Sequence, residues 1–236
     1  MYSVVSLFAG IGGICLGFKQ AGFKIIWANE KDHSACLTYR HNFGNDYLIE
    51  GDIRNISEAH IPHADILAAG FPCQSFSAAG AGRGFSDPRG TLFFEVIRVA
   101  KAIQPRIIFL ENVENLMEHD NGRTFQTIYS SLVELGYIIR YQAMATHEYA
   151  NIPQTRRRIY IVAFADLELS DRFRFPEPIP LTSGAMECLK LDERKPDIYY
   201  YSEDTPFDRY IRDSVKDRRY IYRIFNGSAR KLTNSK

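Results

Sequence analysis

Short apolar runs recur along the first two thirds of the chain, and small or polar residues follow each of them. Runs of this length, bounded by turn residues, are typical of strands buried on both faces of a parallel sheet. The pattern predicts strands at 3–7, 24–28, 47–50, 66–69, 106–110 and 159–164. A helix is predicted at 14–20, and the order strand, glycine turn, helix is typical of a Rossmann-type unit. We therefore predict an α/β fold with a central, mostly parallel sheet.

The glycine turn after the first strand is the first candidate binding site. Its sequence is Phe8-Ala9-Gly10-Ile11-Gly12-Gly13. Glycines let the backbone approach a ligand closely, and the start of the next helix offers unpaired N–H groups. Position 15 is a cysteine where the dinucleotide fingerprint has a third glycine, so the turn alone is weak evidence.

Acids at the next two strand ends extend this site. Glu30 lies about twenty residues after the turn, where a carboxylate can accept both ribose hydroxyls of a nucleoside. Asp52 is either an acceptor for an adenine amino group, with Ile53 packed on the ring, or an ordinary helix cap. The three strand ends together favour an adenosine pocket.

Residues 70–77, Gly-Phe-Pro-Cys-Gln-Ser-Phe-Ser, place Cys73 directly after a predicted strand. The carboxyl ends of parallel strands form the ligand-binding edge of such a sheet. Pro72 restricts its own φ and biases Phe71 toward an extended conformation, which gives a stiff loop able to aim a nucleophile. The alternative is that Cys73 is a small buried hydrophobic residue, as free cysteines often are.

Two further motifs follow. Glu111 comes after the predicted strand 106–110, where apolar neighbours can raise the pKa of a carboxyl group until it holds a proton. The alternative is an acid that favours a helix N-terminus. The run Gln154-Thr155-Arg156-Arg157-Arg158 precedes the last predicted strand. Such a basic run is usually a solvated surface, but here one or two arginines are expected to point into the site.

In this order the motifs resemble those of the cytosine-C5 DNA methyltransferases, over roughly residues 1–165. The matching segments are Phe8-Ala9-Gly10-x-Gly12-Gly13, Gly70-Phe71-Pro72-Cys73-Gln74-Ser75, Asp87-x-Arg89-Gly90-x-Leu92-Phe93, Glu111-Asn112-Val113 and Gln154-x-Arg156-x-Arg158. One position departs from the family pattern: Lys31 stands where an aromatic residue often stacks on adenine.

The resemblance implies methyl transfer from S-adenosylmethionine to C5 of a cytosine flipped out of double-stranded DNA. Cys73 would add to C6, and Glu111 would hold or supply a proton at N3. Arg156 and Arg158 would donate hydrogen bonds to O2. The implied cofactor-binding residues are Phe8, Gly10, Ile11, Gly13, Glu30, Asp52, Ile53, Pro72 and Leu92. The implied DNA contacts are Gln74, Ser75, Arg83, Arg89 and Gln154. Residues 75–90 are expected to form a mobile loop that closes over the DNA.

Composition agrees with this interpretation. The chain has 236 residues, 45% of them hydrophobic, which is enough for one well-cored domain and a smaller piece. Its cysteines, at 15, 36, 73 and 188, have neither metal-ligand nor disulfide spacing, so no metal is expected. No signal peptide or membrane-spanning stretch is evident. We therefore expect a cytoplasmic enzyme, in the reducing compartment that a catalytic thiol requires.

The net charge of +1 hides an asymmetry. From residue 189 onward, twelve Lys and Arg stand against eight Asp and Glu, and six of the fourteen tyrosines lie between Tyr199 and Tyr222. Basic residues among tyrosines suit either a DNA backbone surface or a subunit interface. We expect a catalytic domain at 1–175 and an incomplete target-recognition region at 176–236.

The family's remaining recognition region and a last helix beside the first strand have no counterpart in the sequence. The expectation is either a subunit of a split enzyme, completed by a second polypeptide, or a truncated form. An apolar strip beside 4–7 and the helix from Ile14 would then be exposed. The alternatives to a DNA methyltransferase of a restriction-modification system are a tRNA cytosine methyltransferase and a non-catalytic partner that kept the fold.

Overall fold

The computed structural model describes residues 1–72 and 92–184, and beyond them only 187, 193–194, 196–197, 222–225 and 228–231. Contacts divide the chain into two units, Met1–Gly184 and Ala185–Lys236. Of the second unit, the structure describes chiefly the antiparallel strands β8 (Tyr222–Phe225) and β9 (Ser228–Lys231). The role of this unit in target recognition stays a prediction.

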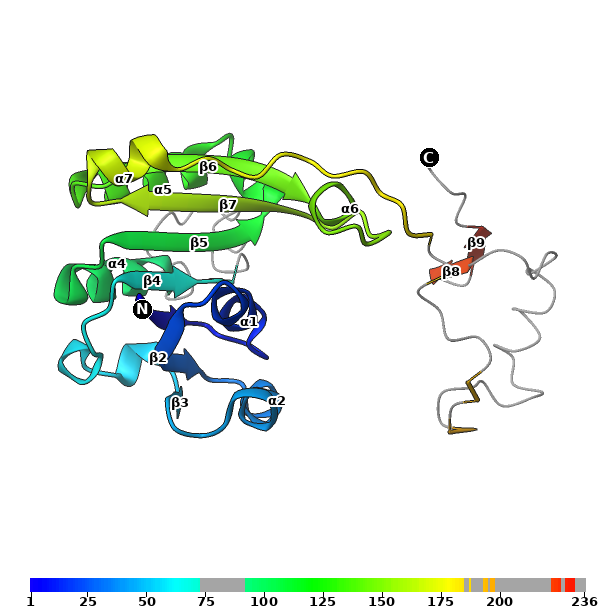
Figure 1. Ribbon diagram of the computed structural model, residues 1–236, viewed down its shortest axis with the longest axis horizontal. Coiled ribbons are helices and arrows are strands. Elements are labelled where there is room, and N and C mark those ends of the chain that lie inside the picture. Colours follow the sequence, from blue (N-terminus) through cyan, green and yellow to red (C-terminus); the bar gives the residue numbers. More distant parts are fainter. Residues whose placement is uncertain are drawn as a thin grey trace. The chain divides into compact units, whose positions relative to one another are not determined.

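The first unit is built on a seven-stranded sheet in the order β3-β2-β1-β4-β5-β7-β6 (Figure 1). Its strands are β1 (Ser3–Leu7), β2 (Lys24–Glu30), β3 (Leu48–Glu50), β4 (Ile66–Ala69), β5 (Ile107–Val113), β6 (Ile138–Ala145) and β7 (Arg157–Phe164). Strands β1 to β5 pair in parallel, whereas β7 is antiparallel to both of its neighbours. The predicted α/β fold with a mostly parallel sheet is confirmed.

Helices pack on both faces of the sheet. One buried cluster joins the sheet to α4 (Leu92–Ile103) and α5 (Arg123–Glu134). A second cluster, on the other face, joins it to α1 (Gly13–Gln20) and α2 (His33–Phe43). Short helices complete the described elements: η1 (Ile53–Asn55), η2 (Glu58–His60), η5 (Glu114–Met117), α6 (Thr146–Tyr149) and α7 (Leu167–Arg172). Within the described ranges, no helix is long and apolar enough to cross a membrane.

Three strands extend further than the sequence pattern predicts. β2 reaches Glu30, β5 reaches Val113 and β7 begins at Arg157, so Glu30 and Glu111 lie inside strands rather than after them. Strand β5 continues because it stays paired with β7 up to the pair Val113 and Arg158. Polar residues thus end the apolar run without ending the ladder of backbone hydrogen bonds, which does not depend on side-chain type.

An apolar cavity of about 630 Å³ lies beside α1, over β4, β5 and β7. Val4, Val5 and Leu7 of β1 are themselves buried. Phe18 of α1 and Ile66, the β4 partner of Val4, line the cavity together with Phe109. An apolar surface is therefore present next to 4–7 and the helix from Ile14, and its cover by a further segment stays a prediction.

Candidate active site

The sheet brings the predicted motifs to one edge. The first five strands are parallel, so the glycine turn, Glu30, Asp52 and Gly70 all follow or end strands at the same carboxyl edge. Because β7 runs the opposite way, its amino end delivers Arg157 and Arg158 to that edge as well (Figure 1). The chain order also reverses between β1 and β4, which is where open α/β sheets bind ligands.

The glycine turn is held in left-handed backbone conformations. Phe8, Gly10 and Gly12 have φ of 54°, 55° and 96°. The N–H of Gly10 donates to Oε2 of Glu30 at 2.8 Å, so the turn and the second strand end are tied together. Gly12 is the N-cap of α1, and a Cβ built there would collide with the ring of Phe43. The sequence motif therefore includes a glycine that the fold itself requires.

We predict that Gly12→Ala lowers the free energy of unfolding by about 1–3 kcal/mol, because it adds a Cβ at positive φ and against the Phe43 ring. Urea unfolding without cofactor measures the effect. Gly13→Ala is the matched control, since a Cβ at Gly13 meets no atom within 4 Å. Equal losses in the two variants would contradict the assignment of strain to position 12.

Most of the predicted cofactor residues surround one cavity of about 340 Å³. It is lined by Phe8, Gly10, Glu30, Asp52, Ile53, Pro72 and Leu92, together with Asn29, Lys31, Gly51 and Gly70. The other two, Ile11 and Gly13, line an adjoining cavity of about 620 Å³ that shares Phe8 and Gly70 with the first. The structure thus gathers residues from four strand ends and the start of α4 around one continuous region.

The Glu30 carboxylate is oriented by backbone donors. Oε2 accepts from Gly10 N, and Oε1 accepts from the N–H groups of Lys31 and Asp32 at 2.7 and 2.8 Å. These bonds fix the carboxylate beside the cavity before any ligand is bound. Preorganisation of this kind lowers the entropic cost of binding.

Asp52 is a helix cap, as one of the two alternatives from sequence predicts. Its side chain caps η1 by accepting from Arg54 N at 3.1 Å, and it also lines the cavity of about 340 Å³, while its contact with an adenine amino group stays a prediction. The Arg54 guanidinium, paired with Asp52 at 2.5 Å, lowers the pKa of Asp52 to about 2. The carboxylate therefore stays ionised, and able to accept a hydrogen bond, until the pH falls towards that value.

Sequence reasoning missed Asn29, which sets the distance between the two acids. Its side chain is 1% exposed, and Nδ2 donates to the carbonyl groups of Ile49 and Gly51 at 3.0 and 2.9 Å. Asn29 precedes Glu30 on β2, and Gly51 precedes Asp52 after β3. The only signal in the sequence is an amide inside an apolar run.

Glu111 and Arg158 form an ion pair at the same edge. Arg158 Nε lies 2.9 Å from Glu111 Oε1, and both side chains are mostly shielded, with exposures of 18% and 23%. The register of β5 and β7 puts Val113 opposite Arg158, and alternation puts Glu111 on that same face. A Cβ on Gly70 would lie 3.4 Å from Glu111 Oε2, so the start of the Cys73 loop runs directly past the carboxylate.

The other arginines of the motif have different surroundings. Arg156 is exposed and lines the apolar cavity near Glu111, and its carbonyl accepts from the N–H and hydroxyl of Thr146. Arg157 instead pairs with Glu114 at 2.7 Å, on η5. One arginine therefore contacts Glu111, a second lines the same cavity and a third joins two structural elements.

Of the remaining predicted residues, Gln154 is exposed, and the others lie outside the residues that the structure describes. Gln154 is exposed, and its carbonyl accepts from His147 N at 3.1 Å. Cys73, Gln74, Ser75, Arg83 and Arg89 lie outside the described residues, as does the loop expected at 75–90. Their roles stay predictions.

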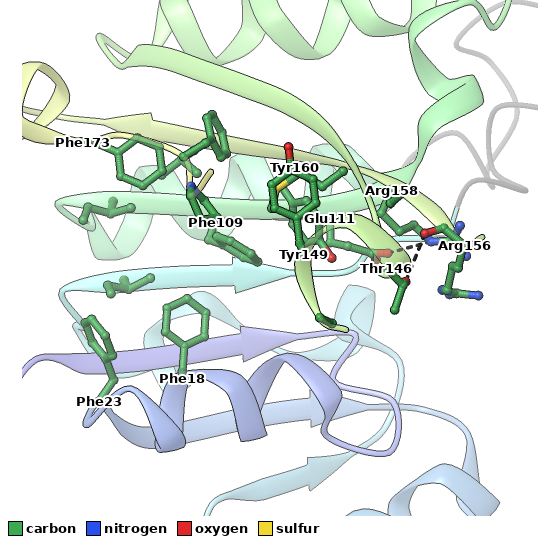
Figure 2. Close-up of a pocket in the computed structure, with 18 of the residues that line it drawn as sticks. Phe18, Phe23, Phe109, Glu111, Thr146, Tyr149, Arg156, Arg158, Tyr160 and Phe173 are labelled. Atoms are coloured by element: carbon green, nitrogen blue, oxygen red, sulfur yellow. Dashed lines mark hydrogen bonds and ion pairs between the residues drawn. The ribbon is translucent and has the colours of Figure 1, made fainter. Parts of the chain in front are cut away.

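Figure 2 shows how the apolar cavity meets the polar edge of the site. Phe18 contacts both Phe109 and Phe23 edge to face, with ring centroids 5.3 and 5.4 Å apart, and these rings line the cavity together. Glu111, Arg156 and Arg158 gather at one end. The cavity thus runs from the candidate catalytic acid along the face of β5 and β7.

The sheet order, the glycine turn and the acids at successive strand ends define a Rossmann-like α/β fold. Solved structures share this fold: a putative DNA modification methyltransferase of an E. coli prophage has a TM-score of 0.60 at 24% identity over 76% of this chain and 53% of its own. Dnmt2 of S. pombe has a TM-score of 0.58 at 22% identity over 75% and 53%.

Sequence comparison then gives the family. Residues 2–231 match the C-5 cytosine-specific DNA methylase family, and the chain belongs to it. Type II methyltransferase M.Bsp6I of Bacillus sp. is 50% identical over 206 residues, covering 86% of this chain and 65% of the relative. M.HaeII of Haemophilus aegyptius is 45% identical over 203 residues, covering 86% and 62%. The chain thus spans somewhat under two thirds of these relatives.

The family predicted from the motifs is confirmed. Its members are S-adenosylmethionine-dependent enzymes, which also confirms the class of cofactor expected from the sequence.

Proposed function

We propose that this chain carries the catalytic part of a DNA methyltransferase that modifies C5 of cytosine, within a restriction-modification system. The observation that carries the proposal is the sharing of one sheet edge by the Glu111–Arg158 pair, the start of the Cys73 loop and the adenosine cavity. Relatives named type II methyltransferases, at up to 50% identity, support the reaction class and the biological setting.

The cavity residues fit an S-adenosyl cofactor. Glu30 would accept the ribose hydroxyls, Asp52 the adenine amino group, and Ile53 would pack on the ring. Lys31 stands in place of an aromatic residue and lines the same cavity. The methylene groups of its side chain would pack on the face of the adenine ring opposite Ile53. The turn at Phe8 and Gly10 approaches closely enough to bind through its backbone. S-adenosylmethionine, when bound, supplies an electrophilic methyl group on its sulfonium.

Cytosine C5 is a weak nucleophile, so the protein must activate the ring. The thiolate of Cys73 forms a bond to C6, and the electron pair of the C5–C6 double bond moves into the ring and becomes available at C5. Glu111 donates a proton or hydrogen bond at N3, and Arg156 and Arg158 stabilise O2. After C5 has accepted the methyl group, a water molecule takes the C5 proton and the N3 proton returns to Glu111. The bond between C6 and the Cys73 sulfur then breaks as the C5–C6 double bond re-forms.

In a DNA duplex the target carbons are stacked between neighbouring bases. The enzyme therefore must extrude the nucleotide into its site, which costs a few kcal/mol of stacking and pairing energy. We assign Gln74, Ser75, Arg83, Arg89 and Gln154 to contacts with the flipped nucleotide and its backbone. Arginine side chains suit phosphate contacts, which position DNA without reading its sequence.

The apolar cavity over β5 and β7 requires a cover in the active enzyme. Exposed apolar surfaces of this kind mark interaction sites. Because the cavity meets the site at Glu111, covering it also excludes water from the reacting groups. We propose that a further helical segment lies there, either in the same polypeptide or in a second one.

A complementation experiment tests the proposal. Residues 1–236 are assayed alone and together with the segment of the Bacillus relative that the alignment leaves uncovered. We expect the mixture to transfer labelled methyl groups to cytosine C5 of duplex DNA, to protect specific restriction sites, and to bind S-adenosylmethionine more tightly than the chain alone. Transfer to tRNA but not DNA, or cofactor binding with no transfer to either, would contradict the proposed reaction.

A further inference from the structure

Asn112 is a buried amide that the proposed chemistry does not use. Its side chain is 4% exposed and lies on β5 directly after Glu111. Nδ2 donates to the carbonyl of Phe71 at 2.9 Å, and Oδ1 accepts from the N–H of Val113 at 2.8 Å. Both ends of the amide are engaged, so its orientation is fixed by partners that sit on two different segments.

Phe71 connects this amide to the nucleophile. It lies two residues before Cys73, is 2% exposed, and its ring packs 5.6 Å from that of Phe93 on α4. Strand β4 pairs with β5 as far as Ala69 and Leu110, so the next two residues of the β4 chain, Gly70 and Phe71, continue beside Glu111 and Asn112. The hydrogen bond from Asn112 therefore prolongs the link between the strands after the backbone pairing ends.

Consecutive side chains of β5 contact this segment from opposite faces of the sheet. Glu111 passes Gly70 on the face that carries α1, and Asn112 holds the Phe71 carbonyl on the face that carries α4. Strand β7 in turn fixes the backbone of both residues through the pairs Glu111–Tyr160 and Asn112–Ile159. The spacing between the acid and the loop is thus set by one rigid strand.

We propose that Asn112 is the positioning residue of this site: through the Phe71 carbonyl it sets where Cys73 stands relative to the base held by Glu111. The inference rests on the proposed function, because it assigns the nucleophile to Cys73. Reacting atoms must lie within a narrow range of distances, and a misplacement of about 1 Å can cost about 10²-fold in rate. The effect is on the chemical step and not on cofactor affinity.

Asn112→Asp provides the sharpest test because it replaces the donor with an oxygen of the same shape. An ionised carboxylate cannot donate to Phe71, whereas a protonated one can. Burial and the Phe71 carbonyl favour the neutral form of such a carboxyl group and raise its pKa, whereas the Val113 N–H favours the ionised form. We expect burial and the carbonyl to prevail, because a full charge at a site 4% exposed loses most of its hydration. The donor is therefore absent at high pH and restored as the pH falls from about 9 to about 6.

The measured quantity is the ratio of variant to wild-type rate of covalent adduct formation on DNA that contains 5-fluorocytosine, at saturating cofactor and at each pH. It is measured in the preparation in which the wild-type chain methylates DNA. We expect Asn112→Asp to be about 10²-fold slower at high pH and to recover as the pH falls. Asn112→Ala should show a similar loss at every pH, and cofactor affinity should be unchanged in both.

Thr124→Val is the matched control for lost stability. Thr124 is 4% exposed at the start of α5, and its hydroxyl is hydrogen-bonded to His119 at 2.7 Å. Removing this buried bond should lower the melting temperature and leave the adduct rate unchanged.

Three results would overturn the inference. One is a variant ratio near one at all pH values, and another is a slow Asn112→Asp variant whose ratio does not change with pH although circular dichroism shows a folded chain. If Asn112→Asp does not fold, a normal rate for Asn112→Ala is the third. Absence of an adduct in the wild-type protein would overturn the proposed function itself, and the inference with it.

Discussion

Cys73→Ser should abolish methyl transfer and should leave the fold and cofactor affinity intact. The exchange replaces one atom in a loop, but a serine hydroxyl is a far weaker nucleophile than a thiolate at neutral pH. Loss of the nucleophile is expected to lower the rate by on the order of 10⁴-fold or more. On duplex DNA that contains 5-fluorocytosine, the wild-type assembly should form an adduct that survives denaturation, because fluorine at C5 blocks the final elimination.

The other cysteines provide controls for this result. Cys15 and Cys36 are buried, and burial raises the pKa of both thiols, so neither supplies a thiolate to a bound base. Cys188 belongs to the second unit, and Cys188→Ser should retain the adduct. Peptide mapping of the adduct should find the base on the peptide that contains Cys73. Methylation at the wild-type rate by Cys73→Ser would refute the covalent mechanism.

The fold could be predicted from sequence because its signals are local. Short apolar runs marked the buried strands, and glycine at positions 10 and 12 marked a turn that needs left-handed backbone. Strand ends were less accurate. The pattern ended the fifth strand at Leu110, whereas pairing with β7 carries it to Val113. The length of a strand depends on its pairing partner, so the sequence of one strand alone does not show where the pairing ends.

The residues that support the site were missed for a similar reason. Asn29 donates to two carbonyl groups and Asn112 to one, and all three are remote in sequence, 20 to 41 residues away. In the sequence, each appears only as a polar residue near the end of an apolar run. Their bonds exist only because parallel pairing brings β2 beside β3 and β4 beside β5. Residue chemistry thus predicted the candidate ligand-binding groups, whereas tertiary structure was needed to find the side chains that hold the segments around them.

The ion pair between Glu111 and Arg158 was also not predictable in detail. The sequence placed both residues in the site, but only the antiparallel register of β5 and β7 puts them on one face, 2.9 Å apart. In the proposed reaction this pair has two effects. It orients the carboxyl group beside Gly70, and it places a cation next to the ring on which negative charge develops.

Glu111→Gln should separate orientation from proton transfer. Glutamine keeps the length of the side chain and an oxygen that can accept from Arg158, so DNA and cofactor binding should be retained. It cannot deliver a proton to N3, and the rate of methyl transfer should fall by on the order of 10²–10⁴-fold.

Glu114→Gln is the matched control. Glu114 is a nearby carboxylate at the start of η5 that also has an arginine partner, Arg157 at 2.7 Å, and its side chain is 35% exposed. Loss of an exposed pair of this kind costs about 0–1 kcal/mol of stability, and the rate should stay near that of the wild type. Single-turnover methylation at saturating DNA and cofactor compares the two variants. If Glu111→Gln reacts as fast as Glu114→Gln, then Glu111 does not supply the proton at N3, and its pair with Arg158 is structural.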